Sequence, residues 1–295
     1  MTVTVITGTS SGIGLATAIR LAKAGHKVYA GVRNPDGADN LREVIDAGEL
    51  PISMLEIDMM DESLIIDAVD RVLAAEGQID VLVNNAGITQ GTSVEETQMS
   101  VVRRVFETNY FGVFALTHAV IPGMRERKNG TIVNVSSIAG RFVFPTNAAY
   151  ASSKYALEAL SESLALQLKP FNIRVAIIEP GVTATSVFEN AAKAMGPPDT
   201  ASPYFVHTRR MIKLFTKQLG ISALTPPDTV AQAIETAITT DTPKLRYVVG
   251  ADAEMFWAAR QRVSDEEYME AASIEDDEDY YDAMTEMIGV DLWRP

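Results

Sequence analysis

The chain has 295 residues, of which 47% are hydrophobic, and it has no cysteine. This composition allows one large α/β domain and excludes both a disulfide framework and a thiol nucleophile. The formal net charge is −14, but residues 265–295 hold twelve acidic side chains against one arginine, so this tail carries −11 and the preceding body only −3. A nearly neutral body without a basic patch argues against nucleic acid as a partner.

Metal ligands, export signals and membrane spans are not apparent in the sequence. His26, His118 and His207 lie far apart and form no recognisable metal set. The amino terminus enters a predicted strand at residues 2–7 without a basic leader, and no apolar run approaches the roughly 20 residues that span a bilayer. We therefore expect a cytoplasmic protein with no metal and no membrane span.

The first predicted unit is a strand over residues 3–7, a glycine-rich turn and a helix that ends near Gly25. The turn reads Gly8-Thr-Ser-Ser-Gly12-Ile-Gly14. Glycines between a strand and a helix let a pyrophosphate approach the helix amino terminus, where unpaired N–H groups point outward. The turn thus predicts a dinucleotide site, whose candidate residues are Gly8, Ser10, Ser11, Gly12, Ile13 and Gly14.

The second and third predicted strands point to the adenosine end of that site. The strand over residues 27–32 is followed by Arg33, and an arginine here accepts a ribose 2′-phosphate where an acid would bind the 2′-hydroxyl. Arg33 therefore favours NADP(H) over NAD(H). Asp36 lies in the turn signature Asn34-Pro-Asp-Gly37 and is interpreted as a turn former. The strand over residues 52–57 places Asp58 beside the adenine, and Asp61 caps a helix over residues 61–75.

The fourth predicted strand, residues 81–83, is closed by Asn84-Asn85-Ala86-Gly87. Ligands gather at the carboxyl ends of strands in open α/β sheets, so Asn85, Ala86 and Gly87 are candidate cofactor-binding residues. A long helix expected over residues 100–124 carries Asn109 among apolar neighbours. If buried, Asn109 must have a hydrogen-bond partner, so it either satisfies the backbone or holds a water in the site.

The strand predicted over residues 130–135 leads to Ser136 and Ser137, and apolar residues at helical spacing predict a helix over residues 148–168. Tyr150 and Lys154 lie four apart near its start, which places both side chains on one face. A free tyrosine has a pKa of about 10, and a nearby ammonium lowers it. With a serine hydroxyl holding a carbonyl or alcohol oxygen beside the phenol, Tyr150 can exchange a proton with that oxygen.

The last part of the body contains a strand over residues 173–178, a loop that begins Glu179-Pro180-Gly181, a helix over residues 227–239 and a strand over residues 247–249. Residues 186–225 are apolar and weakly periodic and are predicted to form a substrate lid. We expect one domain over residues 1–252, and an acidic extension over residues 253–295 that packs on this domain through its aromatic side chains.

Together these motifs resemble those of the classical short-chain dehydrogenases/reductases (SDR), over about residues 3–252. The resemblance favours Ser137 over Ser136, because family members place the catalytic serine thirteen positions before the tyrosine. The acidic extension departs from common members, which end soon after the seventh strand. The motifs occur in the family's order and spacing: Thr7-Gly8-x-x-x-Gly12-Ile13-Gly14, Asn84-Asn85-Ala86-Gly87, Asn109, Ser137, Tyr150-x-x-x-Lys154 and Pro180-Gly181.

The resemblance implies a doubly wound, Rossmann-type parallel sheet of about seven strands with helices on both faces. It also implies a catalytic tetrad. Tyr150 is the general acid/base, Ser137 orients the substrate oxygen, Lys154 binds the nicotinamide ribose and lowers the tyrosine pKa, and Asn109 holds a proton-relay water. The cofactor site is completed by Pro180, Gly181, Val182, Thr183 and Thr185. The two threonines would touch the carboxamide of the nicotinamide.

The function implied is that of an NADP(H)-dependent carbonyl reductase or dehydrogenase. It would interconvert a ketone or aldehyde with the alcohol on a small-to-medium, hydrophobic substrate, as the family's steroid and retinoid enzymes do. Two alternatives stay open, an NAD-dependent alcohol dehydrogenase of the same family and a non-catalytic cofactor-sensing protein. A homodimer or homotetramer is expected, because relatives pair through the helices that carry Asn109 and Tyr150.

Overall fold

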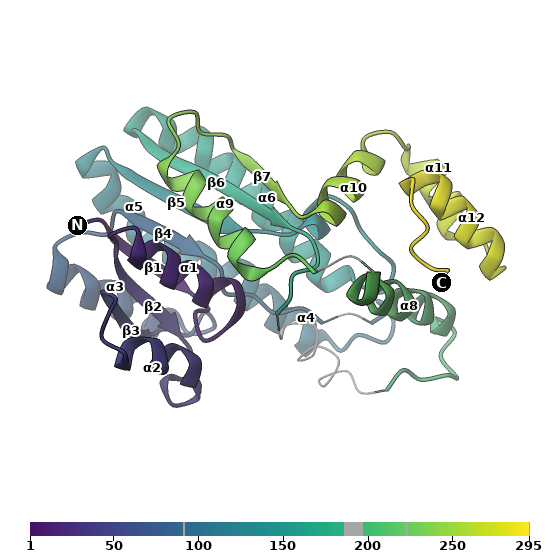
Figure 1. Cartoon of the computed structure of the whole chain (residues 1–295), viewed down its shortest axis with the longest axis horizontal. Coiled ribbons are helices and arrows are strands. Elements are labelled where there is room, and N and C mark those ends of the chain that lie inside the picture. Colours follow the sequence, from purple (N-terminus) through teal and green to yellow (C-terminus); the bar gives the residue numbers. More distant parts are fainter. Residues whose placement is uncertain (91, 186–196, 222–223, 295) are drawn as a thin grey trace.

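A seven-stranded parallel sheet forms the centre of the molecule (Figure 1), as predicted. The computed structural model describes residues 1–90, 92–185, 197–221 and 224–294. The strand order is β3-β2-β1-β4-β5-β6-β7. The chain therefore adds β2 and β3 on one side of β1 and β4 to β7 on the other, which is the doubly wound arrangement. The strands are β1 (Val3–Thr7), β2 (Lys27–Val32), β3 (Ile52–Glu56), β4 (Val81–Asn84), β5 (Gly130–Val135), β6 (Ile173–Pro180) and β7 (Arg246–Val249).

Helices cover both faces of the sheet. On one face lie α1 (Gly12–Lys23), α2 (Asp39–Asp46) and α9 (Pro227–Thr239). On the other lie α3 (Glu62–Glu76), α4 (Met99–Phe106), α5 (Gly112–Arg127) and α6 (Ala148–Leu168). The long helix expected over residues 100–124 is helical throughout, but a π-helical turn over Glu107–Phe111 separates α4 from α5.

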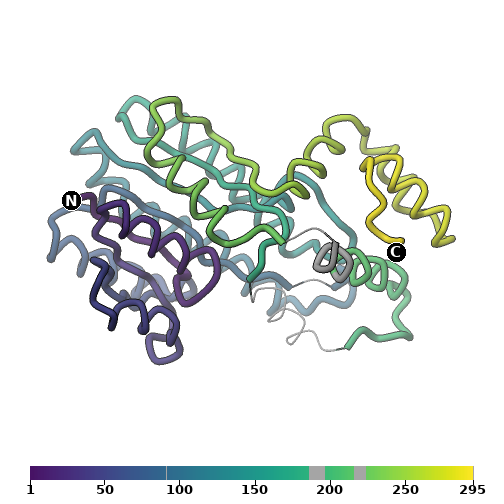
Figure 2. The backbone as a smooth tube through the Cα atoms, in the orientation of Figure 1, coloured from purple at the N-terminus to yellow at the C-terminus, as the bar shows by residue number. Residues whose placement is uncertain are grey.

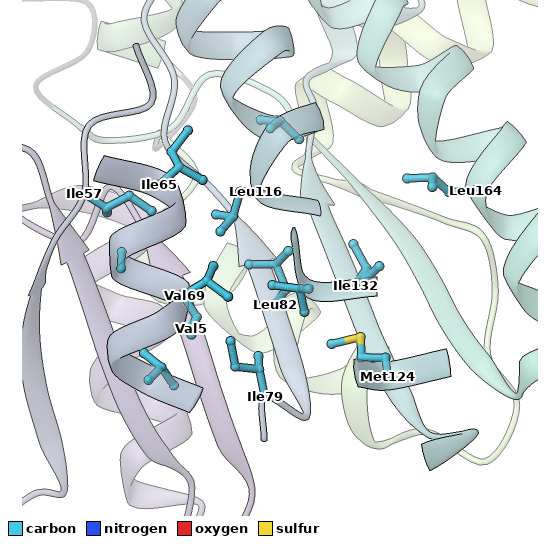
Figure 3. Packing of buried hydrophobic residues seen from close by; sticks show 14 of the residues in the cluster. Val5, Ile57, Ile65, Val69, Ile79, Leu82, Leu116, Met124, Ile132 and Leu164 are labelled. Carbon is cyan, nitrogen blue, oxygen red and sulfur yellow. The ribbon is translucent and has the colours of Figure 1, made fainter. Parts of the chain in front are cut away.

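Alternation along the strands divides the sheet's apolar residues between two cores. Val5 points into one core and Ile6 into the other, and Ile132 and Val133 divide in the same way. Because helices cover both faces, the strands read as continuous apolar runs. Figure 3 shows the core under α3 and α5, where Leu82 of β4 meets Leu116 of α5.

The ends of several elements are fixed by side-chain caps and glycines that the sequence indicated. The Asp61 carboxylate accepts hydrogen bonds from the backbone N–H groups of Ser63 and Leu64, and so caps α3 as predicted. Gly77 ends the same helix in the left-handed region, with φ of 75°. Asn34 caps the short turn Pro35–Gly37, which places Asp36 in that turn as interpreted.

A third apolar cluster lies beyond the carboxyl ends of the strands. Figure 2 shows the chain leaving β7 and folding back toward α8 (Phe205–Ile221) through α10 (Ala251–Arg260), α11 (Asp265–Ala272) and α12 (Asp277–Ile288). The absence of regular structure expected over residues 186–225 is wrong for α8, and residues 186–196 and 222–223 lie outside the described residues. The cluster buries aromatic side chains of the tail, among them Phe256, Tyr280, Tyr281 and Trp293.

Buried Arg210 fastens α8 to the tail. Its guanidinium pairs with Asp277 at 3.0 Å and donates to the carbonyl oxygens of Ile274 and Glu275, each at 2.8 Å. The same group lies 4.0 Å from the ring centroid of Tyr280. The acidic side chains of α11 and α12 otherwise face outward in large part, so the tail buries its aromatic residues and leaves its negative charge in solvent.

Candidate active site

A cavity of about 570 Å³ opens at the carboxyl ends of the strands, and the residues singled out in the sequence meet there. Loops after β1, β2, β3, β4, β5 and β6 all contribute to its wall. Parallel strands carry their loops to the same edge of a sheet, which explains why residues from Gly8 to Thr185 converge. Of the predicted site residues, all but Asn109 line the cavity.

The glycine turn forms a tight bend between β1 and α1. Gly8 has φ of 72°, and a Cβ on Gly14 would lie 2.1 Å from the carbonyl oxygen of Gly8. Asn85 braces this bend by donating from Nδ2 to the carbonyl oxygens of Thr7 and Gly8, at 2.9 and 3.1 Å. Ser11 precedes α1 without a side-chain cap, so backbone N–H groups at the start of α1 face the cavity unblocked.

Arg33, Asn34 and Asp58 line the end of the cavity beyond β2 and β3. Arg33 is exposed, so its guanidinium can reach a charged group of a ligand. Asp58 accepts a hydrogen bond from the N–H of Met60 at 3.0 Å, which holds its carboxylate in a local turn. Asp36 does not line the cavity.

Tyr150, Ser137 and Lys154 lie together between β5 and the start of α6. The Ser137 hydroxyl lies near the phenol of Tyr150 and accepts a hydrogen bond from the N–H of Ala139 at 3.1 Å. The ammonium of Lys154 donates to the carbonyl oxygen of Val135 at 2.8 Å and lies 5.7 Å from the centroid of the Tyr150 ring. The three groups expected to work together are therefore in contact or close by.

The pKa of Tyr150 differs from the sequence-based expectation. Burial raises this pKa above the ordinary tyrosine value, and the nearby Ser137 hydroxyl opposes that rise. Lowering by Lys154 was expected, but the ammonium lies beside the ring rather than bonded to the phenol oxygen. Desolvation disfavours the charged phenolate, so Tyr150 holds its proton at neutral pH.

Asn109 lies behind the cavity wall, in the π-helical turn. Its Oδ1 accepts from the N–H of Ile88 at 2.9 Å, and its Nδ2 donates to the Ile88 carbonyl at 2.9 Å and to the Ser153 hydroxyl at 3.0 Å. Of the two alternatives for this buried amide, the contacts support satisfaction of the backbone. Asn109 thereby fixes the chain after Gly87, on the wall nearest Lys154.

The loop after β6 is held by Asp252, at the start of α10. The Asp252 carboxylate accepts from the N–H of Val182 at 2.6 Å, and burial raises its pKa. A Cβ on Gly181 would lie 2.2 Å from this carboxylate, so the loop needs glycine here. A Cβ on Gly12 would meet the methyl of Thr185 at 2.9 Å, which places this loop against the glycine turn.

An aromatic wall, comprising Phe144, Phe215 and Phe256, lines the same cavity as Tyr150. Ring centroids lie 4.9 Å apart for Phe144 and Phe256 and 6.5 Å apart for Phe144 and Phe215. These residues come from the loop after β5, from α8 and from α10. Their aromatic character was visible in the sequence, but no short-range pattern indicated that they meet.

The cavity has the features that a nicotinamide dinucleotide requires. The glycine turn and open helix terminus suit a pyrophosphate, and Arg33 suits a charged ribose substituent. Lys154 lies near Tyr150, and the loop after Pro180 lines the same cavity, so these groups could hold the nicotinamide end. No group of three metal-ligating side chains occurs among residues 1–90, 92–185, 197–221 and 224–294.

Sequence and structure comparisons support the same interpretation. The family model described as short chain dehydrogenase matches residues 2–196. The uncharacterized oxidoreductase YusZ of Bacillus subtilis is 36% identical over 251 residues, which are 84% of this chain and 89% of that protein. Human retinol dehydrogenase 8 is 36% identical over 248 residues, which are 82% of this chain and 79% of that protein.

Among solved structures, a short-chain dehydrogenase from Streptomyces avermitilis shares 35% sequence identity and superimposes with a TM-score of 0.77, over 91% of this chain and 95% of that one. In the part of this chain that the structure describes, no helix combines the length and apolar character needed to cross a membrane.

Proposed function

This chain belongs to the short-chain dehydrogenase family, and on that premise we propose that it interconverts a ketone or aldehyde with the corresponding alcohol, using NADP(H), on a small-to-medium hydrophobic substrate. Enzymes of this family are oxidoreductases that act on CH–OH groups with NAD(P), and this chain is one of them. The observation that carries the finer proposal is that Tyr150, Ser137 and the aromatic wall line the same cavity.

Each member of the site has a distinct task in this proposal. NADP(H), when bound, supplies or accepts the hydride. Ser137 holds the substrate oxygen, and Tyr150, protonated at neutral pH because burial raises its pKa, donates a proton to that oxygen during carbonyl reduction. Lys154 places a positive charge beside the phenol and can reach the ribose, while Asn109 fixes the backbone next to it.

The aromatic wall supports a hydrophobic substrate. Phe144, Phe215 and Phe256 offer large apolar surfaces, and burial of apolar area favours binding by roughly 25 cal/mol per Å². The name of human retinol dehydrogenase 8 gives retinol, a hydrophobic alcohol, as that relative's substrate. We also propose residues 186–225 as a lid over this end and residues 253–295 as an extension of the 1–252 domain.

A substrate screen tests the reaction and the substrate class. NADPH absorbance is followed with steroids, retinoids, quinones and small ketones, and with polar sugar acids as the comparison. We expect kcat/KM to rise with the apolar area of the substrate. A preference for the sugar acids would contradict the hydrophobic assignment, and no NADPH consumption by any carbonyl would contradict the reaction.

Replacement of Arg33 by alanine tests the choice of cofactor. Removing a charged hydrogen bond to the 2′-phosphate costs about 1.5–3 kcal/mol, so Arg33→Ala is expected to weaken NADPH binding at least tenfold and to leave NADH binding nearly unchanged. Fluorescence titration with both cofactors measures the two dissociation constants.

Arg42→Ala is the matched control for this experiment. Arg42 is a neighbouring arginine on α2 that does not line the cavity and pairs with Asp36 and Asp39 at the surface. It should leave both affinities unchanged. Tighter binding of NADH than of NADPH by the unmodified protein would favour the NAD-dependent alternative.

We further propose that the chain self-associates through the outer faces of α5 and α6. Large apolar side chains are exposed on α5, on α6 and on the π-helical turn that precedes α5, namely Phe111, Phe114, Tyr155 and Leu166. Exposed apolar groups gathered on one face mark protein–protein contacts. Phe114→Glu is expected to shift a dimer or tetramer toward the 32.0 kDa monomer in sedimentation velocity.

Ile66→Glu serves as the control for assembly, because Ile66 is comparably exposed but lies on α3. This variant should sediment like the unmodified protein. Sedimentation of the unmodified protein as a monomer at all concentrations would overturn the proposed assembly.

A further inference from the structure

Four charged side chains form a partly buried cluster, hereafter the quartet, beside the candidate active site. Glu158 of α6 and Glu179 of β6 are almost fully buried. Arg246 of β7 contacts both carboxylates at 3.1 Å, and Arg141, from the loop after Ser137, contacts Glu179 at 3.0 Å. Two carboxylates and two guanidiniums balance in charge, which makes their burial tolerable.

Arg246 connects the quartet to the surface, where it also pairs with Glu162 on the next turn of α6. Arg141 connects it to the carboxyl-terminal segment, since its guanidinium lies 3.7 Å from the ring centroid of Trp257. The quartet is therefore held in place by four elements. None of its members was a predicted site residue.

Glu158 also lies one helical turn after Lys154. Residues four apart on a helix are neighbours on its surface, and Lys154 is 4% exposed. Burial lowers the pKa of Lys154 to about 8, and the Glu158 carboxylate is the charge that opposes this fall. The uncharged Val135 carbonyl is the hydrogen-bond acceptor of the ammonium.

We propose that Glu158 is a positioning residue that keeps Lys154 protonated, with the rest of the quartet holding the Glu158 carboxylate in place. This role rests on the proposed function, because the ammonium acts by stabilising negative charge on the oxygen of Tyr150 as its proton leaves. Glu158 touches neither the phenol nor the substrate oxygen. It acts through Lys154.

The charged and titratable groups around Glu158 set the pH range of this effect. They are Lys154, Tyr155 and Glu162 on α6, Arg141 after β5, Glu179 on β6 and Arg246 on β7. Burial, assisted by the negative charge of Glu179, raises the pKa of Glu158 to about 7, and Arg246 and Arg141 oppose the rise. Its charge is present above pH 7 and is lost as the pH falls through 7.

The charge on Lys154 follows the opposite course, because an ammonium with a pKa of about 8 is protonated below that pH and neutral above it. Without the Glu158 charge the pKa of Lys154 falls further, because a nearby opposite charge favours the ammonium. Below pH 7 the Glu158 carboxyl is itself protonated, and its loss then changes little. The contribution of Glu158 is therefore largest near pH 8.

Glu158→Gln is the decisive variant, because glutamine has the shape of a protonated glutamate. The alkaline limb of kcat should move about one pH unit toward acid, which gives about fivefold lower turnover at pH 8 and nearly equal turnover at pH 6. Glu162→Gln, which removes the exposed carboxylate on the same arginine, should leave the profile unchanged. Glu158→Asp keeps the charge and should restore much of the alkaline activity.

A second measurement does not depend on turnover. NMR of the protein labelled with ¹³C-lysine, with the Lys154→Arg spectrum used for assignment, gives the pKa of Lys154 without cofactor, and this pKa should fall in Glu158→Gln. An equal loss of activity at every pH together with an unchanged Lys154 pKa would overturn the proposal. If no carbonyl is turned over, the proposed function fails, and the NMR titration still decides the role of Glu158.

Discussion

Replacement of Tyr150 by phenylalanine should lower kcat/KM for carbonyl reduction about a thousandfold, because a positioned general acid contributes about 10²- to 10⁴-fold. The variant removes only the phenol hydroxyl, which lies near Ser137. The ring itself lies in the cavity wall, so cofactor binding should change little. Steady-state kinetics with the best substrate of the screen, together with fluorescence titration of NADPH, separates the two effects.

Tyr155→Phe is a matched control for this variant. Tyr155 lies on the same helix, but its side chain is exposed and it does not line the cavity. Its replacement should leave kcat/KM within about twofold of the unmodified enzyme, since surface substitutions seldom change stability or function much. Retention of more than a tenth of the activity by Tyr150→Phe would refute the assignment of Tyr150 as the proton donor.

Replacement of Gly14 by alanine should strongly weaken cofactor binding. The added methyl would lie 2.1 Å from the carbonyl oxygen of Gly8 and 2.6 Å from Nδ2 of Asn85. Neither group can move without opening the glycine turn, and overpacking of this kind costs about 1–3 kcal/mol. A cost of that size in the bound geometry lowers affinity for NADPH up to about 100-fold.

Replacement of Gly123 by alanine should instead stabilise the protein and leave cofactor binding unchanged. Gly123 lies inside α5, and a methyl there would meet only the far end of the Arg127 side chain, at 3.1 Å. Alanine is favoured over glycine inside a helix by roughly 1 kcal/mol, so Gly123→Ala should bind NADPH normally and unfold at a slightly higher temperature. Unchanged NADPH affinity in Gly14→Ala would show that the turn does not hold the cofactor.

Much of the fold could be predicted because each element carries a local pattern. The β-branched strands between glycines and polar turns marked the sheet, and the apolar spacing of α6 and α9 gave both helices with their observed ends. Helix α2 went unnoticed, since only Leu41 is buried in its eight residues. Helix α8 and the tail helices were missed because their apolar residues pack on one another rather than on the sheet. In α11 and α12, acidic residues also dominate the pattern.

The candidate site, too, could be predicted only in part from the sequence. Motifs whose residues are close in sequence, such as the glycine turn and Tyr150 with Lys154, were found, and they line the cavity. The quartet was not predicted, because in the sequence Glu158 looks like an ordinary charged residue of a helix. Only the structure places Arg246, 88 residues away, beside it. The predicted direction of the Tyr150 pKa shift was wrong for a related reason. Burial dominates this shift, and sequence spacing does not reveal how deeply a side chain is buried.

The π-helical turn at Glu107–Phe111 accommodates one residue more than an α-helix does in the same span. Removing one residue next to Asn109 would let the turn close into regular helix while α4 and α5 keep nearly the same relative rotation, so Val105 would stay in the interior. The Asn109 amide, which the turn carries, would lose its bonds to Ile88. A deletion here would therefore remove the support of the backbone after Gly87 and leave the helix intact.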